Sequence, residues 1–132
     1  MSERDSVESG LPGSDGEHEL QERYGTSKRA CGFYSKQMLD HLNEEMRLFI
    51  ARQEMVFVST ADSNGECDGS LRCGEPGFVR VLDDHRLVYP EYRGNGVMAS
   101  LGNISTNGHI GMFFADFFVS TVGLHINGKA SI

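Results

Sequence analysis

MVFVSTADSNGECDGSLR, residues 55–72, sets the fold class that we predict for this chain. Residues 55–61 are rich in β-branched and apolar side chains, which favour a strand. They end at Asp62-Ser63-Asn64-Gly65, and Asn-Gly between two strand-like runs is a strong signal for a hairpin turn. Residues 66–72 then read as a second, more polar strand, so the pattern predicts an antiparallel hairpin.

Further turns and short apolar runs follow this hairpin. Gly74-Glu75-Pro76-Gly77 interrupts the chain, and Asp83-Asp84-His85-Arg86 separates two runs that form a second predicted hairpin. The pattern predicts strands at residues 78–82, 87–89, 109–118, 121–126 and 129–132, with a turn at Asn127-Gly128 and a helical insert at 97–104 after the fourth strand. Many short strands joined by hairpin turns are typical of an antiparallel barrel, so we predict a mainly β fold.

The segment before the first hairpin has helical periodicity. Apolar residues between 36 and 52 recur at spacings of three and four, which predicts an amphipathic helix with one core-facing side, and Ser35 is a candidate cap. They are Met38, Leu39, Leu42, Met46, Phe49 and Ile50. We interpret the methionines as packing residues rather than ligands. Residues 18–29 are polar and predict a short helix followed by a loop at Gly25.

The negative charge is concentrated at the N-terminus. Residues 1–22 hold seven acidic side chains and one basic one, although the whole chain has a net charge of only -7. We predict a disordered acidic leader at 1–17 and a folded domain at 18–132. The nearly neutral domain argues against a nucleic-acid partner, which would favour a basic face. Because Ile132 falls inside a strand-like run, we expect the barrel to be incomplete at the C-terminus.

Other classes of protein have little support. No apolar run is long enough to span a membrane, and no signal peptide is recognisable, so we predict a cytoplasmic protein without membrane attachment. Three cysteines without C-x-x-C spacing read as reduced thiols, which fits that compartment. The five histidines have no metal-site spacing, and no Gly-x-Ser-x-Gly motif supports a hydrolase.

A candidate phosphate site lies between the fourth strand and the helical insert, at residues 89–103. Gly94 and Gly96 allow the backbone to approach a ligand, and Arg93 supplies a forked, permanently charged donor. Exposed N–H groups at the start of the insert attract anions. The alternative interpretation is a glycine-rich surface turn, because the stretch matches neither nucleotide-loop fingerprint.

Five segments, in this order, resemble the pyridoxamine 5′-phosphate oxidase-like family of flavin-binding split β-barrels: residues 59–65, 68–72, 74–79, 87–103 and 123–130. The resemblance covers residues 18–132. It is strongest to a subgroup with Arg-x-Gly-Pro-Pro-Gly-Phe and Tyr-Arg-Gly-Asn-Gly patterns, although Glu75 stands at a usual proline. The Arg-x-x-Leu-Leu-Lys block of the vitamin B6 oxidase is not intact.

The resemblance implies an antiparallel, Greek-key-like split barrel that binds flavin mononucleotide (FMN) at a homodimer interface. By position, the phosphate and ribityl chain would be held by Ser70, Arg72, Arg93, Asn95 and Ser100. The isoalloxazine ring would lie along backbone groups of Phe78, Val79 and Arg80 and along Tyr89, Pro90 and Glu91. No catalytic residue and no metal ligand is implied.

Several of these residues have structural alternatives. Arg72 can instead be an exposed charge on a strand, and Ser100 an exposed serine on the helix. Tyr89 and Tyr92 can both be residues that pack at the rim of the site. We expect the Arg80 side chain to face solvent and His125 to be a structural histidine rather than an acid or base. Four phenylalanines, which we assign to a core face and a dimer interface, are Phe113, Phe114, Phe117 and Phe118.

Two classes of function follow. One is an FMN-dependent oxidoreductase that acts on a small molecule, with the hydride chemistry supplied by the flavin. The other is a non-catalytic protein on the same barrel that carries flavin, deazaflavin or haem. Yellow protein would favour a flavin, whereas a Soret band would favour haem.

Overall fold

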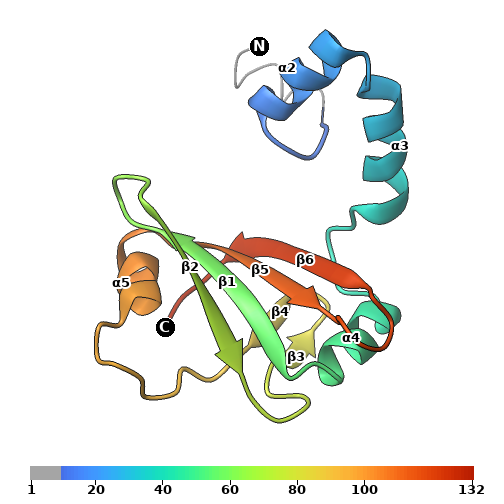
Figure 1. The fold of residues 1–132 in the computed structure, drawn as a ribbon. Helices are drawn as coiled ribbons and strands as arrows, with labels where there is room; N and C mark the ends of the chain where they lie inside the picture. The colour runs from blue at the N-terminus through green and yellow to red at the C-terminus, as the bar shows by residue number, and fades with distance from the viewer. Residues whose placement is uncertain (1–9) are drawn as a thin grey trace. The chain divides into compact units, whose positions relative to one another are not determined.

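The computed structural model describes residues 10–132, which fall into two compact units that divide between His41 and Leu42. The first unit contains helices α2 (Asp15–Tyr24) and α3 (Ser27–Gln37). The second contains α4 (Glu44–Ala51), α5 (Ala99–Thr106) and six strands (Figure 1). No helix in the described part of the chain is both long and apolar enough to cross a membrane.

Two local motifs define the helical unit. Ser14 and Glu17 form a capping box at the start of α2, and Gly25 ends that helix in the left-handed region at φ 71°. Tyr34 of α3 is buried, donates to Glu17 Oε2 at 2.5 Å and accepts from Gln21 Nε2 at 2.7 Å. The loop predicted at Gly25 is therefore present, and these bonds join the two helices.

The acidic leader was predicted to extend to residue 17, but α2 begins at Asp15 because Ser14 caps it. The predicted disorder at residues 1–9 lies outside the described residues. The divide between the two units also falls within the predicted 18–132 domain.

The single helix predicted at 36–52 is wrong. Helix α3 ends at Gln37, Met38 is extended, and a new helix begins after Asn43, whose side chain accepts from Met46 N at 2.9 Å. Ser35 lies inside α3 and donates to Gly32 O, so it caps nothing. The apolar spacing continued across the break because Leu42, Phe49 and Ile50 are all core residues.

The strands form a four-stranded antiparallel sheet in the order β2-β1-β5-β6 and a separate antiparallel pair, β3-β4. Their bounds are β1 (Met55–Ala61), β2 (Cys67–Cys73), β3 (Arg80–Asp83), β4 (Arg86–Val88), β5 (His109–Ala115) and β6 (Gly123–Lys129). Both predicted hairpins are confirmed, with Met55 opposite Cys73 and Ala61 opposite Cys67 in the first. The architecture is that of a split β-barrel whose sheet is not closed.

The last strands differ from the prediction. Strand β5 ends at Ala115, because the Asp116 carboxylate accepts backbone N–H groups from Phe118, Val119 and Ser120 and so shapes a turn. The predicted turn at Asn127-Gly128 is instead part of β6, where Gly128 pairs with Ile110. The two predicted strands at 121–126 and 129–132 are therefore one strand, Gly123–Lys129.

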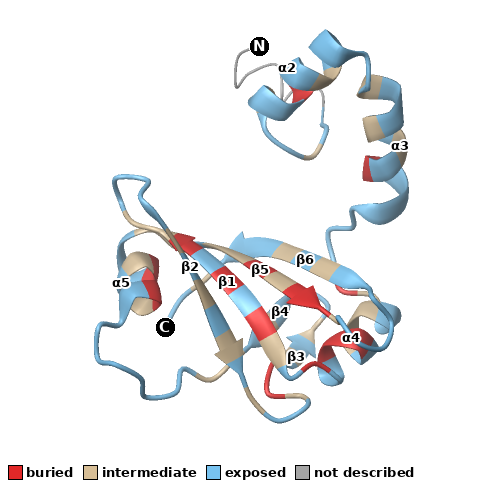
Figure 2. Cartoon of the chain, viewed as in Figure 1, coloured by how far each residue is buried: buried red, intermediate tan, exposed pale blue. Residues whose placement is uncertain are grey.

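The core lies on one face of the sheet. Alternation along β1 buries Val56, Val58 and Thr60 and leaves Phe57 and Ser59 on the other face (Figure 2). Helix α4 contacts β3, and α5 contacts β1 and β2. The buried apolar residues of this core are Leu42, Phe49, Ile50, Val56, Val58, Phe78, Val79, Met112 and Phe114.

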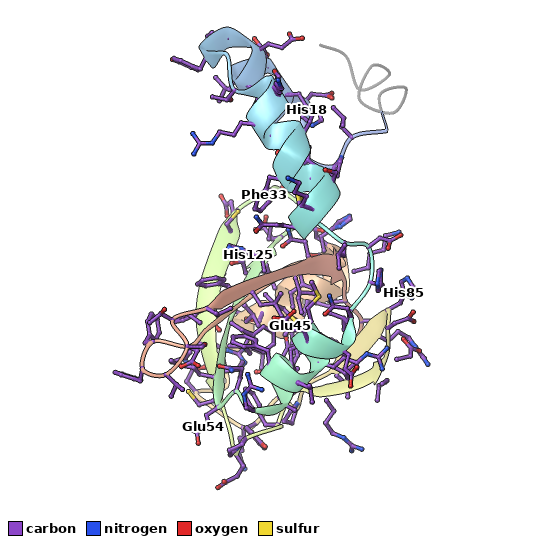
Figure 3. All side chains as sticks on the ribbon, turned by 90° about the vertical axis from the view of Figure 1, so that its right-hand side faces the viewer. His18, Phe33, Glu45, Glu54, His85 and His125 are labelled. Atoms are coloured by element: carbon purple, nitrogen blue, oxygen red, sulfur yellow. The ribbon has the colours of Figure 1, made fainter. Side chains whose placement is uncertain are left out.

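The four phenylalanines have three different environments. Phe114 is fully buried in the core. Phe113 lies on the opposite face of β5, where its ring is 4.5 Å from that of His125, which Figure 3 labels on β6. Phe117 and Phe118 lie beyond the strand and are exposed. The core assignment therefore holds for Phe114, whereas the dimer interface stays a prediction.

We expect Phe114→Ala to lower the free energy of unfolding by about 3–5 kcal/mol, because it removes a fully buried ring and leaves a cavity. Urea denaturation of the purified chain measures this change. The matched control is Phe118→Ala, since Phe118 is 92% exposed and its truncation should change the free energy by less than about 0.5 kcal/mol. Equal losses in the two variants would contradict the assigned core.

Candidate functional site

Helix α5 is fixed against the sheet by two polar contacts. Asn103 Nδ2 donates to the buried Thr60 Oγ1 at 3.0 Å, and Asn107 Nδ2 donates to Asp62 O at 3.4 Å. Thr60 occupies a position on the buried face of β1 where Val56 and Val58 precede it. Its hydroxyl therefore bonds to the helix, and α5 is held beside the edge strand β2.

Arg72 is the centre of the candidate site. It lies opposite Val56, and Ser70 lies opposite Val58, so both side chains are on the core side of β2. Arg72 Nη1 donates to Ser70 Oγ and to Leu71 O, the latter at 3.1 Å. Arg72 Nη2 donates to Ser100 Oγ of α5 at 3.2 Å. The guanidinium thus joins strand and helix through two hydroxyl groups.

Glu91 supplies a negative charge to this arginine, from the segment between β4 and α5. Glu91 Oε1 lies 2.8 Å from Arg72 Nε, and the side chains of Glu91 and Arg72 are 26% and 20% exposed, respectively. The Nε atom is buried, and its N–H is not aligned on that oxygen for a hydrogen bond. The pair is therefore an electrostatic contact in a partly dehydrated setting, which leaves one arginine donor poorly satisfied.

Tyr89 shares this environment. It is partly buried and packs against the hydrophobic core. Burial raises the pKa of the Tyr89 phenol, the negative charge of Glu91 raises it further, and the positive charge of Arg72 opposes both. The phenol therefore keeps its proton beyond the pH at which an ordinary tyrosine loses it.

The start of α5 adds donors next to Arg72. Its N-cap is Met98, which has a positive φ of 58° and makes no side-chain capping bond. The first N–H groups of a helix have no partner within the helix and favour anions. The buried Ser100 lies in this first turn. A phosphate group needs a positive charge and several hydrogen-bond donors. Here these are an arginine, two hydroxyl groups and the N–H groups of a helix start without a side-chain cap.

Other predicted phosphate residues are not joined to this group. Arg93 and Asn95 are exposed, and Asn95 Oδ1 accepts from Val97 N at 2.9 Å within its own loop. Among residues 10–132, no hydrogen bond or ion pair links either side chain to Arg72. Of the glycines in this loop, Gly96 has a positive φ of 82°.

The residues predicted along the flavin ring occupy three settings. Phe78 and Val79 have buried side chains, and the Phe78 N–H already donates to Glu75 O at 2.9 Å. Arg80 is exposed, as expected, and pairs with Val88 in the β3-β4 ladder. Tyr89 and Pro90 are partly buried beside Glu91 in the sequence. Their contact with a flavin ring stays a prediction.

Sequence reasoning missed two side-chain contacts. It placed Glu91 along the ring but did not pair its carboxylate with Arg72. It also did not use the Thr60–Asn103 bond, which positions α5. The available signal for Thr60 was its hydroxyl group, because the other residues that alternate onto the buried face of β1 are apolar. Nothing in the local pattern identified the partner of Glu91.

Comparisons with known proteins agree with this architecture. Residues 42–132 match the family model described as pyridoxamine 5′-phosphate oxidase. The crystal structure of a histidine-to-alanine variant of HupZ from Group A Streptococcus, at 23% sequence identity and a TM-score of 0.52, covers 67% of this chain and 67% of its own. That similarity supports the fold. No match was found among curated proteins.

The raised pKa of Tyr89 predicts a specific loss of stability in alkali. Because the folded state holds this proton more tightly than the unfolded state, its contribution is complete below the ordinary pKa of about 10 and is lost as pH rises through the folded value. Above a pH of about 10, the free energy of unfolding should fall more steeply in the native chain than in Tyr89→Phe. Urea denaturation at several alkaline pH values measures both slopes.

The control for this comparison is Tyr92→Phe, which changes an exposed phenol in the same segment. Its slope in the same alkaline range should equal that of the native chain. A Tyr89→Phe slope equal to both would show that Tyr89 does not titrate differently in the folded state.

Proposed function

Since the chain belongs to the pyridoxamine 5′-phosphate oxidase family, we propose that it binds FMN and acts as a flavin-dependent oxidoreductase on a small molecule. The observation that carries this proposal is the group formed by Arg72, Ser70 and Ser100 at the start of α5. FMN differs from riboflavin by a phosphate group. This group of side chains supplies the donors that a phosphate needs.

The residues of the chain divide the work of binding. Arg72 neutralises the phosphate, and the hydroxyl groups of Ser70 and Ser100, which accept from Arg72, donate their protons to phosphate oxygens. Tyr89 and Pro90 provide partly buried apolar surface for the ring. When bound, FMN supplies the capacity for hydride transfer, so the protein's task is to position the flavin and exclude water.

A homodimer completes the proposal. One cross-strand row on the sheet face opposite the core consists of Leu71, Phe57, Phe113 and His125. Leu71 is 46% exposed and Phe57 is 38% exposed. Burial of such a row against a second copy would remove apolar area from water. We propose that this face forms the subunit interface and that the FMN site lies at its edge.

The second candidate is a non-catalytic carrier of flavin, deazaflavin or haem on the same barrel. The same side chains, Arg72, Ser70 and Ser100, support this candidate when the ligand is a flavin or a deazaflavin, because both can carry a phosphate. An absorbance spectrum distinguishes a flavin from haem. We also propose a cytoplasmic location, because the three cysteines are free and exposed.

An absorbance spectrum of the purified protein tests the proposed function. Flavin bands that elute with the protein on gel filtration would support FMN binding, and bleaching by an organic substrate that does not bleach free FMN would support the oxidoreductase. A bound flavin that no donor reduces would favour the carrier. A Soret band, or colourless protein that takes up no added FMN, would refute the proposal.

We expect Arg72→Ala to weaken FMN binding by about 1–3 kcal/mol, through loss of a charge-assisted contact to the phosphate. Isothermal titration calorimetry measures the change. Arg52→Ala is the control, because it removes an exposed arginine from the end of α4 and should leave the affinity unchanged. Unchanged affinity in both variants would refute the assigned phosphate site.

The proposed interface is tested by Leu71→Glu, which introduces a charge into the exposed apolar row. We expect this variant to shift the sedimentation coefficient from dimer to monomer, because a carboxylate is costly to bury between subunits. Leu48→Glu on α4 is the matched control, since Leu48 is 56% exposed and lies away from this face. A native chain that sediments as a monomer would contradict the dimer.

A further inference from the structure

The Glu91 carboxylate lies beside Arg72 in the candidate phosphate site. Its Oε1 atom lies 2.8 Å from Arg72 Nε, a distance typical of a charge-assisted contact between arginine and carboxylate or phosphate oxygen. The Nε N–H is nevertheless not aligned on this oxygen, although the atom is buried. The arginine therefore has a charge partner on this edge but lacks a well-formed hydrogen bond there.

The partners of Arg72 differ in how firmly the fold holds them. Ser70 and the Leu71 carbonyl belong to β2, whose backbone is paired with β1 over its whole length. Ser100 belongs to α5, which Asn103 fixes to the sheet. Glu91 alone among these partners lies in a segment without helix or strand, between Val88 and Ala99. It is also the only anion among them.

We propose that Glu91 is a built-in competitor of the ligand's phosphate group: its carboxylate neutralises Arg72 in the ligand-free protein and leaves when a phosphate monoester binds. This inference rests on the proposed FMN site and adds the residue that limits its affinity for phosphate. Ser70 and Ser100 stay in place, and Arg72 exchanges one anionic partner for another.

Electrostatic repulsion favours this exchange. A phosphate monoester and a carboxylate on the same edge of one guanidinium repel each other, and the repulsion is strong in a partly dehydrated site. Without ligand, by contrast, a partly buried Arg72 needs a counter-charge, because an unpaired charge in such a setting is costly. Glu91 therefore stabilises the empty site and weakens binding of the phosphate by competition.

The influence of Glu91 extends to Tyr89, where it helps to raise the pKa of the phenol. The titratable and charged groups that face one another here are thus Arg72, Glu91 and Tyr89. When a bound phosphate displaces the Glu91 carboxylate, one negative charge moves away from Tyr89. The phosphate brings another negative charge to Arg72.

The test compares FMN with riboflavin in the native chain and in Glu91→Gln. Glutamine keeps the size of the side chain and an oxygen that can lie in the same place beside Arg72 Nε, but it removes the negative charge. We expect Glu91→Gln to bind FMN about tenfold more tightly and riboflavin with less than about a twofold change, because only FMN carries the phosphate. Fluorescence titration of flavin-free protein measures both dissociation constants.

Glu75→Gln controls for net charge, because Glu75 is exposed in the loop after β2 and is not paired with Arg72. It should change neither affinity by more than about twofold. A structural role of Glu91 without competition would leave the ratio of the FMN and riboflavin dissociation constants unchanged in Glu91→Gln. That result, or weaker FMN binding, would overturn the inference.

The same titration separates this inference from the proposed function. Native protein that does not bind FMN would overturn both. Native protein that binds FMN, loses it in Arg72→Ala and shows no gain in Glu91→Gln would keep the phosphate site and refute the competitor alone. As a second readout, FMN should raise the melting temperature of Glu91→Gln more than that of the native chain, because the variant's empty site lacks a counter-charge for Arg72.

Discussion

Pairing of β1 along both of its edges is the constraint on which the rest of the structure depends. Its partners β2 and β5 fix its register, so Val56, Val58 and Thr60 must point to one face. The same register places Arg72 opposite Val56, on the core side of the edge strand. One alternation along a seven-residue strand therefore determines both the core and the orientation of the arginine.

The site lies where this ordered framework meets an irregular segment. Strand β2 contributes Arg72, and α5 contributes Ser100, each held by contacts to β1. The segment between β4 and α5 contributes Glu91 and contains Gly96, whose positive φ favours glycine. Met98 adopts a positive φ without being glycine, a strained conformation of the kind often found at ligand sites. Framework residues thus supply the donors of the proposed phosphate site, and the irregular segment supplies the one negative charge beside Arg72.

Prediction from the sequence succeeded for the fold where local and long-range signals agreed. Asn-Gly flanked by β-rich runs identified the β1-β2 hairpin, and the bounds of β1 were correct to the residue. The helix at 36–52 failed because a capping asparagine at position 43 begins a new helix inside an apolar periodicity that serves the core on both sides of the break. Asn127-Gly128 failed as a turn because pairing with β5 continues through it. For the site, the residue types near the start of one helix indicated a site for a phosphate group. Glu91 and Ser100, however, reach Arg72 from separate parts of the chain, and sequence periodicity does not reveal such pairings.

Because of how charge is distributed along the chain, the Arg72–Glu91 ion pair is the main electrostatic influence on phosphate binding at the proposed site. Seven of the acidic residues fall within the first 22 positions, so residues 23–132 carry a net charge of only -1. The compact unit that holds the site, residues 42–132, has eleven acidic and seven basic side chains and so a net charge of -4. Its long-range field weakly repels an anionic ligand, and salt screens much of that repulsion. Affinity for a phosphate then depends on charges within a few ångströms, which here means Arg72 and the carboxylate already beside it. A change of one nearby charge should consequently matter more than the acidity of the chain as a whole.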